Sequence, residues 1–374
     1  MELSRRALFA SALGATCAGL VGAQAPQTGT IVGQMKPRST EDLPTSLGGK
    51  NLKQWIAEIK SGDPSRRENA IRTIPLLKGG QEAIPELIDR VEHDSDSSPR
   101  VNAVMALGAL PIGPREDVSR IVTALKFRLV NDSQSIIRFQ CALVLGRFGE
   151  QSRAAMKELI QATKDGGSWE IRKAAVFALT RAASDVAKLV NSGAVEALVS
   201  RLSSTSEASA LVRLEAAMSI ATLGMLSKHD HEVVSKGLAN AEYDREKMVA
   251  IWARVGLAVH DNKLTPADIK TLEKYLQSPD LPSRTHAARA LGTIASLGNP
   301  GPLLKPVIPY LIKLLDDKEE LAQVAAIWAL GRIGPDAKAA LPRLKELLQD
   351  KNVTEEGKQF VKEAIDLIEG KVKK

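Results

Sequence analysis

The sequence has 374 residues, of which 44% are hydrophobic, 25% charged and only 3% aromatic, and its net charge is +7. These proportions are ordinary for a folded soluble protein. A core with so few rings must be built mainly from Ala, Leu, Ile and Val, which favours packed helices and argues against a β-sandwich or barrel. Charges of both signs are interspersed, so the basic excess indicates a solvated surface, with binding of an acidic partner as the alternative.

Residues 1–25 have the pattern of a secretory signal peptide. A basic pair, Arg5 and Arg6, precedes an apolar stretch that runs to about Ala23. Small residues then provide a cleavage site after Ala25 or after Ala23. The stretch is short and rich in Ala and Gly, so we do not expect a transmembrane segment in the mature chain. We expect a periplasmic or extracellular protein, exported by the general secretory route or by the twin-arginine route.

Residues 26–50 are expected to form a flexible leader, because they are rich in Pro, Gly, Thr and Ser and lack hydrophobic periodicity. Helical patterning begins at Asn51. Of the two cysteines, Cys17 leaves with the signal peptide, so the mature chain keeps only Cys141 and forms no intramolecular disulfide. The stability of the fold must therefore come from packing.

From residue 51 onward the chain repeats one helical pattern. When a polar residue is taken as position zero, small residues recur at +3 and +8 and larger apolar residues at +7 and +10. Position zero is filled by Arg67, Arg100, Arg138, Arg172, Arg213, Arg245, Arg284 and Gln323. Positions +3, +7 and +10 share one face of an α-helix, and the small residues allow a neighbouring helix to approach closely.

Another amphipathic helix precedes each of these helices, as in residues 83–93 and 307–317. Several of these preceding helices carry a proline two residues before a leucine, which starts or kinks the helix. Asp63-Pro64 and Ser98-Pro99 are start signals for two position-zero helices. Stacked helix pairs bury the apolar faces that one pair leaves exposed. The sequence thus predicts an all-α α-solenoid, a superhelix of about eight to nine antiparallel pairs over residues 51–374, with a charged C-terminal cap helix.

The pattern R-x-x-A-x-x-A-L-G-x-I-G in the second helix and Pro-x-Leu in the first resemble HEAT repeats, and are most similar to the short bacterial type grouped with phycobilisome lyases. The resemblance covers about residues 51–370. It implies protein–protein interaction, and it implies that acids in the turns pair with the helix arginines to link neighbouring repeats. Acids precede several of these arginines: Asp63, Asp96, Asp132 and Asp165. We therefore interpret the arginines as a structural frame and not as a ladder for an acidic ligand.

The segment His229-Asp230-His231 is the strongest metal candidate, because imidazoles and carboxylates bind metals. Residues two apart on a helix diverge, however, and the sequence offers no second cluster. His93 and its acidic neighbours lead to the same conclusion. An iron enzyme with HEAT-like repeats, deoxyhypusine hydroxylase, has several His-Glu pairs, whereas here only His231-Glu232 matches. We predict no catalytic residue, no metal site and no cofactor.

Four tryptophans are candidates for anchoring a partner. We expect Trp252 and Trp328 in the core, and Trp169, near a helix start, to be the most exposed.

The sequence therefore predicts an exported HEAT-repeat scaffold or adaptor that binds another protein or peptide through an extended curved surface and has no catalytic activity. We expect a monomer and no nucleic-acid partner, because exported proteins seldom meet nucleic acid and the chain has few aromatic side chains for stacking. The alternatives are a metal-dependent or pigment-lyase-like HEAT-repeat enzyme that uses His229, Asp230 and His231, and a solenoid that binds a polyanion.

Overall fold

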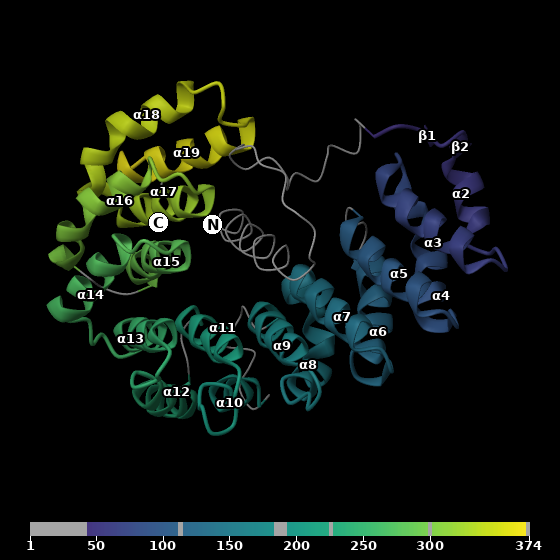
Figure 1. Ribbon diagram of the computed structural model, residues 1–374, viewed down its shortest axis with the longest axis horizontal. Coiled ribbons are helices and arrows are strands. Elements are labelled where there is room, and N and C mark those ends of the chain that lie inside the picture. The colour runs from purple at the N-terminus through teal and green to yellow at the C-terminus, as the bar shows by residue number, and fades with distance from the viewer. Residues whose placement is uncertain (1–42, 111–114, 183–192, 224–226, 298–300, 372–374) are drawn as a thin grey trace. The chain divides into compact units, whose positions relative to one another are not determined.

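The computed structural model describes residues 43–110, 115–182, 193–223, 227–297 and 301–371 (Figure 1). The predicted signal peptide, residues 1–25, and the first part of the predicted leader lie outside these ranges. The described residues fall into two compact units, residues 43–253 and 254–371. Each unit is described by itself below.

The first unit consists of helix pairs. The first helices of the pairs are α2 (Leu52–Glu58), α4 (Ile84–His93), α6 (Arg115–Asn131), α8 (Met156–Ala162), α10 (Ala194–Ser200) and α12 (Lys228–Ala241). The second helices, which we call B helices, are α3 (Pro64–Thr73), α5 (Ser97–Ala109), α7 (Ser135–Phe148), α9 (Trp169–Ala182), α11 (Ala210–Ala221) and α13 (Lys247–His260), which continues into the second unit.

The second unit follows the same plan. Its first helices are α14 (Pro266–Leu276), α16 (Ile308–Leu314) and α18 (Leu341–Gln349), and its B helices are α15 (Leu281–Leu297), α17 (Glu320–Ile333) and α19 (Glu355–Ile368). Short 3-10 helices lead into several first helices: Gly80–Ala83, Gly149–Ala155, Gly301–Val307 and Gly334–Ala340. Pro85, Pro309 and Pro342 then stand in the first turn of α4, α16 and α18, so these prolines start helices and do not kink them.

Within the first unit the helices form two layers. Each B helix from α3 to α11 packs against the next B helix, and each first helix from α4 to α12 packs against the next first helix (Figure 1). In the second unit α15, α17 and α19 pack in the same order. The prediction of an all-α solenoid of about eight to nine antiparallel helix pairs is confirmed.

Small residues at position +8 allow the B helices to approach closely. A Cβ atom added to Gly146 in α7 would lie 2.7 Å from Cε1 of Phe177 and 3.2 Å from Cα of Ala178 in α9. A Cβ added to Gly292 in α15 would collide with the ring of Trp328 in α17. A larger side chain would push these helices apart, as the sequence pattern predicts.

Arginine–carboxylate pairs link one helix pair to the next. Arg213 in α11 donates from Nε and Nη2 to the two carboxylate oxygens of Asp244, at 2.7 and 3.0 Å. Its Nη1 donates to the backbone oxygen of Glu207, at 3.0 Å, in the turn before its own helix. Both side chains are buried, with 0% and 3% exposure. We call each such pair a rung, and one guanidinium in each rung joins two successive turns.

The rung recurs along both units. The rungs are Arg67–Asp94, Arg100–Asp132, Arg138–Asp165, Arg172–Glu207, Arg213–Asp244 and Arg284–Asp317. Burial alone would raise the pKa of Asp244, but hydrogen bonds from Arg213 and from a backbone N–H outweigh it and hold that pKa below its usual range. The pKa of Glu207 is lowered in the same way by Arg172. The arginines thus form a structural frame.

Two of the four expected acids differ from the prediction. Asp132 and Asp165 form rungs as expected. The rung of Arg67 is made by Asp94, and Asp96 adds only one further oxygen, 2.8 Å from Nη2. Asp63 caps α3 by accepting a hydrogen bond from the Ser65 N–H. The reason is positional, because each rung acid stands three or four residues before the B helix that follows it, whereas Asp63 and Asp96 stand directly before a B helix.

The prediction that Arg245 fills position zero is wrong. Each rung arginine is the fourth residue of its B helix, and in α13 the fourth residue is Ala250. Arg245 lies exposed in the turn before α13. Ala253 and Ala258 then provide the small residues at +3 and +8, and both are buried.

The predicted start of α5 is also wrong. Helix α5 begins at Ser97, so Pro99 is the third helical residue and the predicted Ser98 cap lies inside the helix.

The described end of the predicted leader is attached to the first helix pair. Ser46–Leu47 (β1) pairs antiparallel with Lys50–Asn51 (β2). The indole N–H of Trp55 in α2 donates to the backbone oxygen of Leu47, at 3.1 Å. Helix α2 begins at Leu52 with Asn51 as its cap, where the sequence pattern places the start of the helical region.

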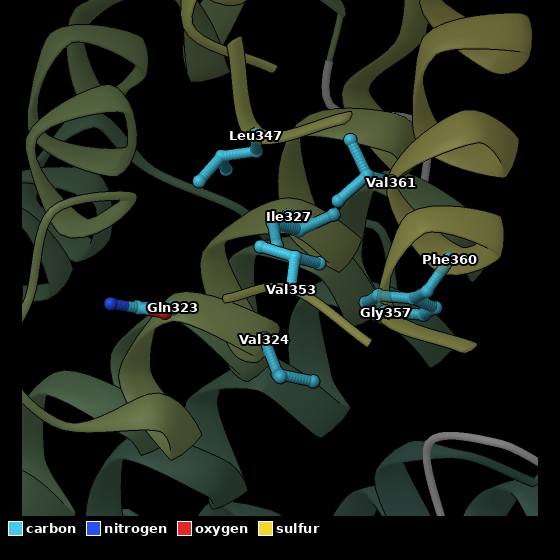
Figure 2. A pocket seen from close by; sticks show the side chains of 8 residues that line it. All are labelled: Gln323, Val324, Ile327, Leu347, Val353, Gly357, Phe360 and Val361. Carbon is cyan, nitrogen blue, oxygen red and sulfur yellow. The ribbon is translucent and has the colours of Figure 1, made fainter. Parts of the chain in front are cut away.

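The last position zero holds Gln323, whose Nε2 donates to the backbone oxygen of Asp317 at 2.5 Å. Because glutamine is shorter than arginine, it does not reach a rung acid in the next turn. A small apolar pocket lies here between α17, α18 and α19 (Figure 2). Its lining residues are Gln323, Val324, Ile327, Leu347, Val353, Gly357, Phe360 and Val361. The Gln323 amide points away from the other lining side chains, toward its own turn.

We predict that Arg213→Ala lowers the free energy of unfolding by about 3–5 kcal/mol, because it leaves the buried Asp244 carboxylate without its partner. Arg245→Ala removes an exposed arginine from a nearby turn and is the matched control, with an expected change of less than about 0.5 kcal/mol. Urea denaturation followed by the intrinsic tryptophan fluorescence of the chain measures both. Equal losses would contradict the assignment of the rung.

Candidate functional site

The segment predicted as the best metal candidate lies at the start of α12. Asp230 accepts a hydrogen bond from the Ser227 hydroxyl, at 2.6 Å, and its backbone N–H donates to the same hydroxyl oxygen, at 3.1 Å. This is helix capping, and it turns the Asp230 carboxylate inward. His229 is exposed, with Nε2 3.8 Å from a Glu196 carboxylate oxygen. The structure uses these residues at a helix start, and across its described ranges it groups no three His, Cys, Asp or Glu side chains for a metal ion.

His93 is also separated from its acidic neighbours. Its Nδ1 lies 3.0 Å from a carboxylate oxygen of Asp89, one turn back along α4. The carboxylate of Asp94, by contrast, is buried in the rung with Arg67. The second metal candidate of the sequence is therefore not assembled either.

Apolar side chains are exposed on the side of the B helices that faces away from the first helices. Met105 in α5, Ile136 in α7 and Leu211 in α11 are 49%, 49% and 47% exposed. They stand at positions +5 or −2 of their helices, and these two positions lie seven residues, about two turns, apart on a single helix face. Positions +3 and +7 of the same helices fill the core, as with Ala103 and Leu107. Helices α5, α7 and α11 therefore have apolar side chains on two faces.

The +5 positions align across neighbouring helices. They are Met105 in α5, Leu143 in α7, Phe177 in α9 and Met218 in α11, and we call them the apolar row. The four helices pack in this order. Phe177 is the most buried of the four, because its ring rests on Gly146 of α7. Half-buried apolar residues flank the row at position +1, namely Val101, Phe139 and Leu214.

Helical periodicity in the sequence does not reveal this row, because apolar residues in a helix usually belong to the core. The usable signal was present: α7 and α11 carry apolar residues at −2, +1 and +5, on the side opposite +3 and +7. In α3 the corresponding positions are Ser65, Glu68 and Arg72, so the apolar face does not extend to α3, whereas α17 of the second unit has Leu321, Val324 and Trp328 at these positions.

The tryptophans only partly follow the prediction. Trp252 is buried in the core, with 1% exposure. Trp328 is half-buried, with its ring packed against Gly292. Trp169, which was expected to be the most exposed, is also half-buried. None of the three forms part of the apolar row.

Residues 269–356 match the model for HEAT repeats. This segment contains HEAT repeats. The matched segment runs from α14 to the start of α19, and the rung Arg284–Asp317 lies within it. The HEAT-repeat pattern of paired helices therefore agrees with the packing described above.

Solved structures with similar folds are distant. An engineered protein is 22% identical with a TM-score of 0.46, over 85% of this chain and 88% of its own. YibA of Escherichia coli is 19% identical with a TM-score of 0.45, over 75% of this chain and 92% of its own. Kap121p bound to Ste12p is 16% identical with a TM-score of 0.43, over 85% of this chain and 37% of the Kap121p chain. Likeness at this level carries no argument about function.

No curated protein matches the chain. Among the helices that the structure describes, none combines the length and the apolar character needed to cross a membrane.

We predict that substitutions at two adjacent isoleucines in α7 change the stability of the fold by very different amounts. Ile136→Glu should change the free energy of unfolding by less than about 1 kcal/mol, because the side chain is exposed and a carboxylate suits the first turn of a helix. Ile137→Glu should unfold this part of the chain, because Ile137 is 0% exposed and an unpaired charge would be buried. Circular dichroism during thermal unfolding measures both. A large loss for Ile136→Glu would show that the exposed face is needed for packing.

Proposed function

We propose that this HEAT-repeat chain is an exported scaffold or adaptor that binds another protein through the apolar row and its flanking residues, and that it has no catalytic activity of its own. The single observation that carries the proposal is the exposure of Met105, Ile136 and Leu211 on the same face of three B helices, α5, α7 and α11. Large apolar side chains that gather on an exposed face mark interaction sites in folded proteins.

The dimensions of the face suit a protein segment. Neighbouring helix axes lie about 8–10 Å apart, so three steps from α5 to α11 span about 25–30 Å. An extended segment of about eight residues, or a longer helix, covers that distance. Full burial of one large apolar side chain contributes about 1.5–3 kcal/mol, so covering several half-exposed side chains offsets the entropy lost on binding.

The rungs support this proposal by leaving the face free. The guanidinium groups are buried between successive turns, so they hold the helices in place and do not occupy the B-helix surface. Binding then requires shape and charge complementarity and no chemistry at the HEAT repeats. Within this proposal the protein acts as a monomer of the short bacterial repeat type, and residues 1–25 direct its export.

The test is site-specific photocrosslinking in intact cells. A benzophenone side chain placed at Met105 should crosslink to one defined protein, and the same group at Thr123, exposed on the first helix α6, should not. The two sites lie on different layers of the same unit, so the pair separates binding at the proposed face from random proximity.

The crosslinked product also tests export. Its HEAT-repeat component should begin at Gln24 or Pro26, as measured by mass spectrometry of its N-terminal peptide. Equal crosslinking from Met105 and Thr123 would argue against the face, and an intact N-terminus would argue against a cleaved signal.

A further inference from the structure

The rung position between α17 and α19 is incomplete. In the complete rung before it, Arg284 donates from Nε and Nη2 to the two carboxylate oxygens of Asp317, at 2.7 and 3.0 Å. Its Nη1 donates to the backbone oxygen of Ser278 in its own turn, at 3.0 Å. Gln323 makes only a contact of the second kind, from Nε2 to the backbone oxygen of Asp317. Position zero of α17 therefore does not fill the place that the forked end of an arginine takes in the rungs.

Asp350 stands where the acid of this rung belongs. It follows Gln323 by 27 residues, the separation found in the rung Arg67–Asp94. One of its carboxylate oxygens accepts the backbone N–H of Asn352, two residues on, at 2.8 Å. The rung acids accept the N–H two residues on in the same way. Asp350 therefore has both the spacing and the local contact of a rung acid.

The Asp350 carboxylate has no counter-charge. Among the residues that the structure describes, no arginine, lysine or histidine forms an ion pair with it. Lys358, the fourth residue of α19, is paired with Glu355 at 2.9 Å. Asp350 is also half-buried, whereas the side chain of Asp94 is 0% exposed in its rung. The carboxylate is thus accessible at the place where the complete rungs hold a guanidinium.

The turn of Asp350 does not itself need a charged residue. In the turn before α3, the first B helix that the structure describes, the position of the rung acid holds Ser61, whose hydroxyl oxygen accepts the Asp63 N–H at 3.2 Å. In the turn before α15 this position holds Ser278, and position zero of the preceding B helix is Ala250. Both described turns that follow no rung arginine thus carry a serine, which supports a turn without charge. The turn before α19 departs from this rule, because it keeps the acid without the arginine.

The turn of Asp350 forms part of the apolar pocket in Figure 2. Backbone hydrogen bonds of 3.3 Å join Asp350 to Leu347 and to Val353, and both of these residues line the pocket. Phe360, which is half-buried, lines it from α19, and Val324 lines it from α17. An arginine side chain suits such a place, because its methylene groups pack on apolar surface while its charged end keeps polar partners.

We propose that an arginine side chain of a partner protein binds at this place and completes the rung from outside. Its methylene groups cover the apolar pocket, and its guanidinium donates to the carboxylate oxygens of Asp350. Arginine is favoured over lysine because its forked end donates two parallel hydrogen bonds to a carboxylate, as Arg284 does to Asp317. The apolar row belongs to the other unit, so this site is an additional one and does not rest on the proposed function.

The test uses the purified chain and a library of short random peptides displayed on phage. Phage that bind Gln323→Arg are removed first, because this variant places its own guanidinium against Asp350 and closes the site. Peptides that then bind the wild type are sequenced, and the affinity of one synthetic peptide is measured by fluorescence anisotropy. The proteins compared are the wild type, Asp350→Asn and Glu346→Gln, which removes an exposed charge from α18 and is the matched control. Melting temperatures establish that the variants fold.

The selected peptides should share an arginine. Its replacement by alanine in the peptide and Asp350→Asn in the protein should each weaken binding by about tenfold or more, because each removes a charge-assisted pair of hydrogen bonds. Glu346→Gln should weaken binding by less than about twofold. The change in the peptide leaves the protein itself intact, so that result does not depend on the folding of a variant.

Three results would overturn the proposal. The first is that no peptide remains after the removal step, and the second is that the selected peptides lack an arginine or accept lysine in its place without loss. The third is that a selected peptide binds Asp350→Asn as tightly as the wild type.

Discussion

The buried pairing of an arginine with a carboxylate from the next helix pair constrains the rest of this structure. In the rung of Arg213, one guanidinium donates to Asp244 and to the backbone oxygen of Glu207, so it fixes two successive turns at once. The same acids accept backbone N–H groups in their own turns, as Asp244 does from Glu246, at 2.8 Å. Removing either partner leaves a buried charge, so a rung constrains the two turns even where the intact pair adds little net stability.

The rungs and the close helix contacts together free one face of each B helix. Small residues such as Gly146 bring α7 and α9 together, and the rungs hold the turns, so the surface beyond the core is not needed for folding. That surface carries the apolar row in the stretch from α5 to α11. Position zero and the apolar row lie five residues apart, on different sides of one helix. Stability and binding are thereby assigned to separate sets of residues.

Much of this fold could be predicted from the sequence, because a repeated pattern with helical periodicity indicates both where the helices lie and that successive helix pairs stack. The frame role of the arginines and the close approach at position +8 were predicted for the same reason. The position of the repeat in α13 could not be predicted correctly, because Ala250 fills position zero. Arg245, five residues earlier, looks like the repeated arginine in the sequence. The choice between Asp94 and Asp96 depends on a turn geometry that spacing alone does not give. The exposed row was missed because helical periodicity does not distinguish a core stripe from a second, uncovered one.

A double-mutant cycle on Arg213 and Asp244 tests the central claim most directly. The free energies of unfolding of Arg213→Ala, Asp244→Ala and the double variant are measured by urea denaturation. If the rung links the helix pairs, the double variant loses much less than the sum of the single losses, with a coupling energy of at least about 1.5 kcal/mol, because the second substitution removes the charge that the first one orphaned. Losses that simply add would contradict the account.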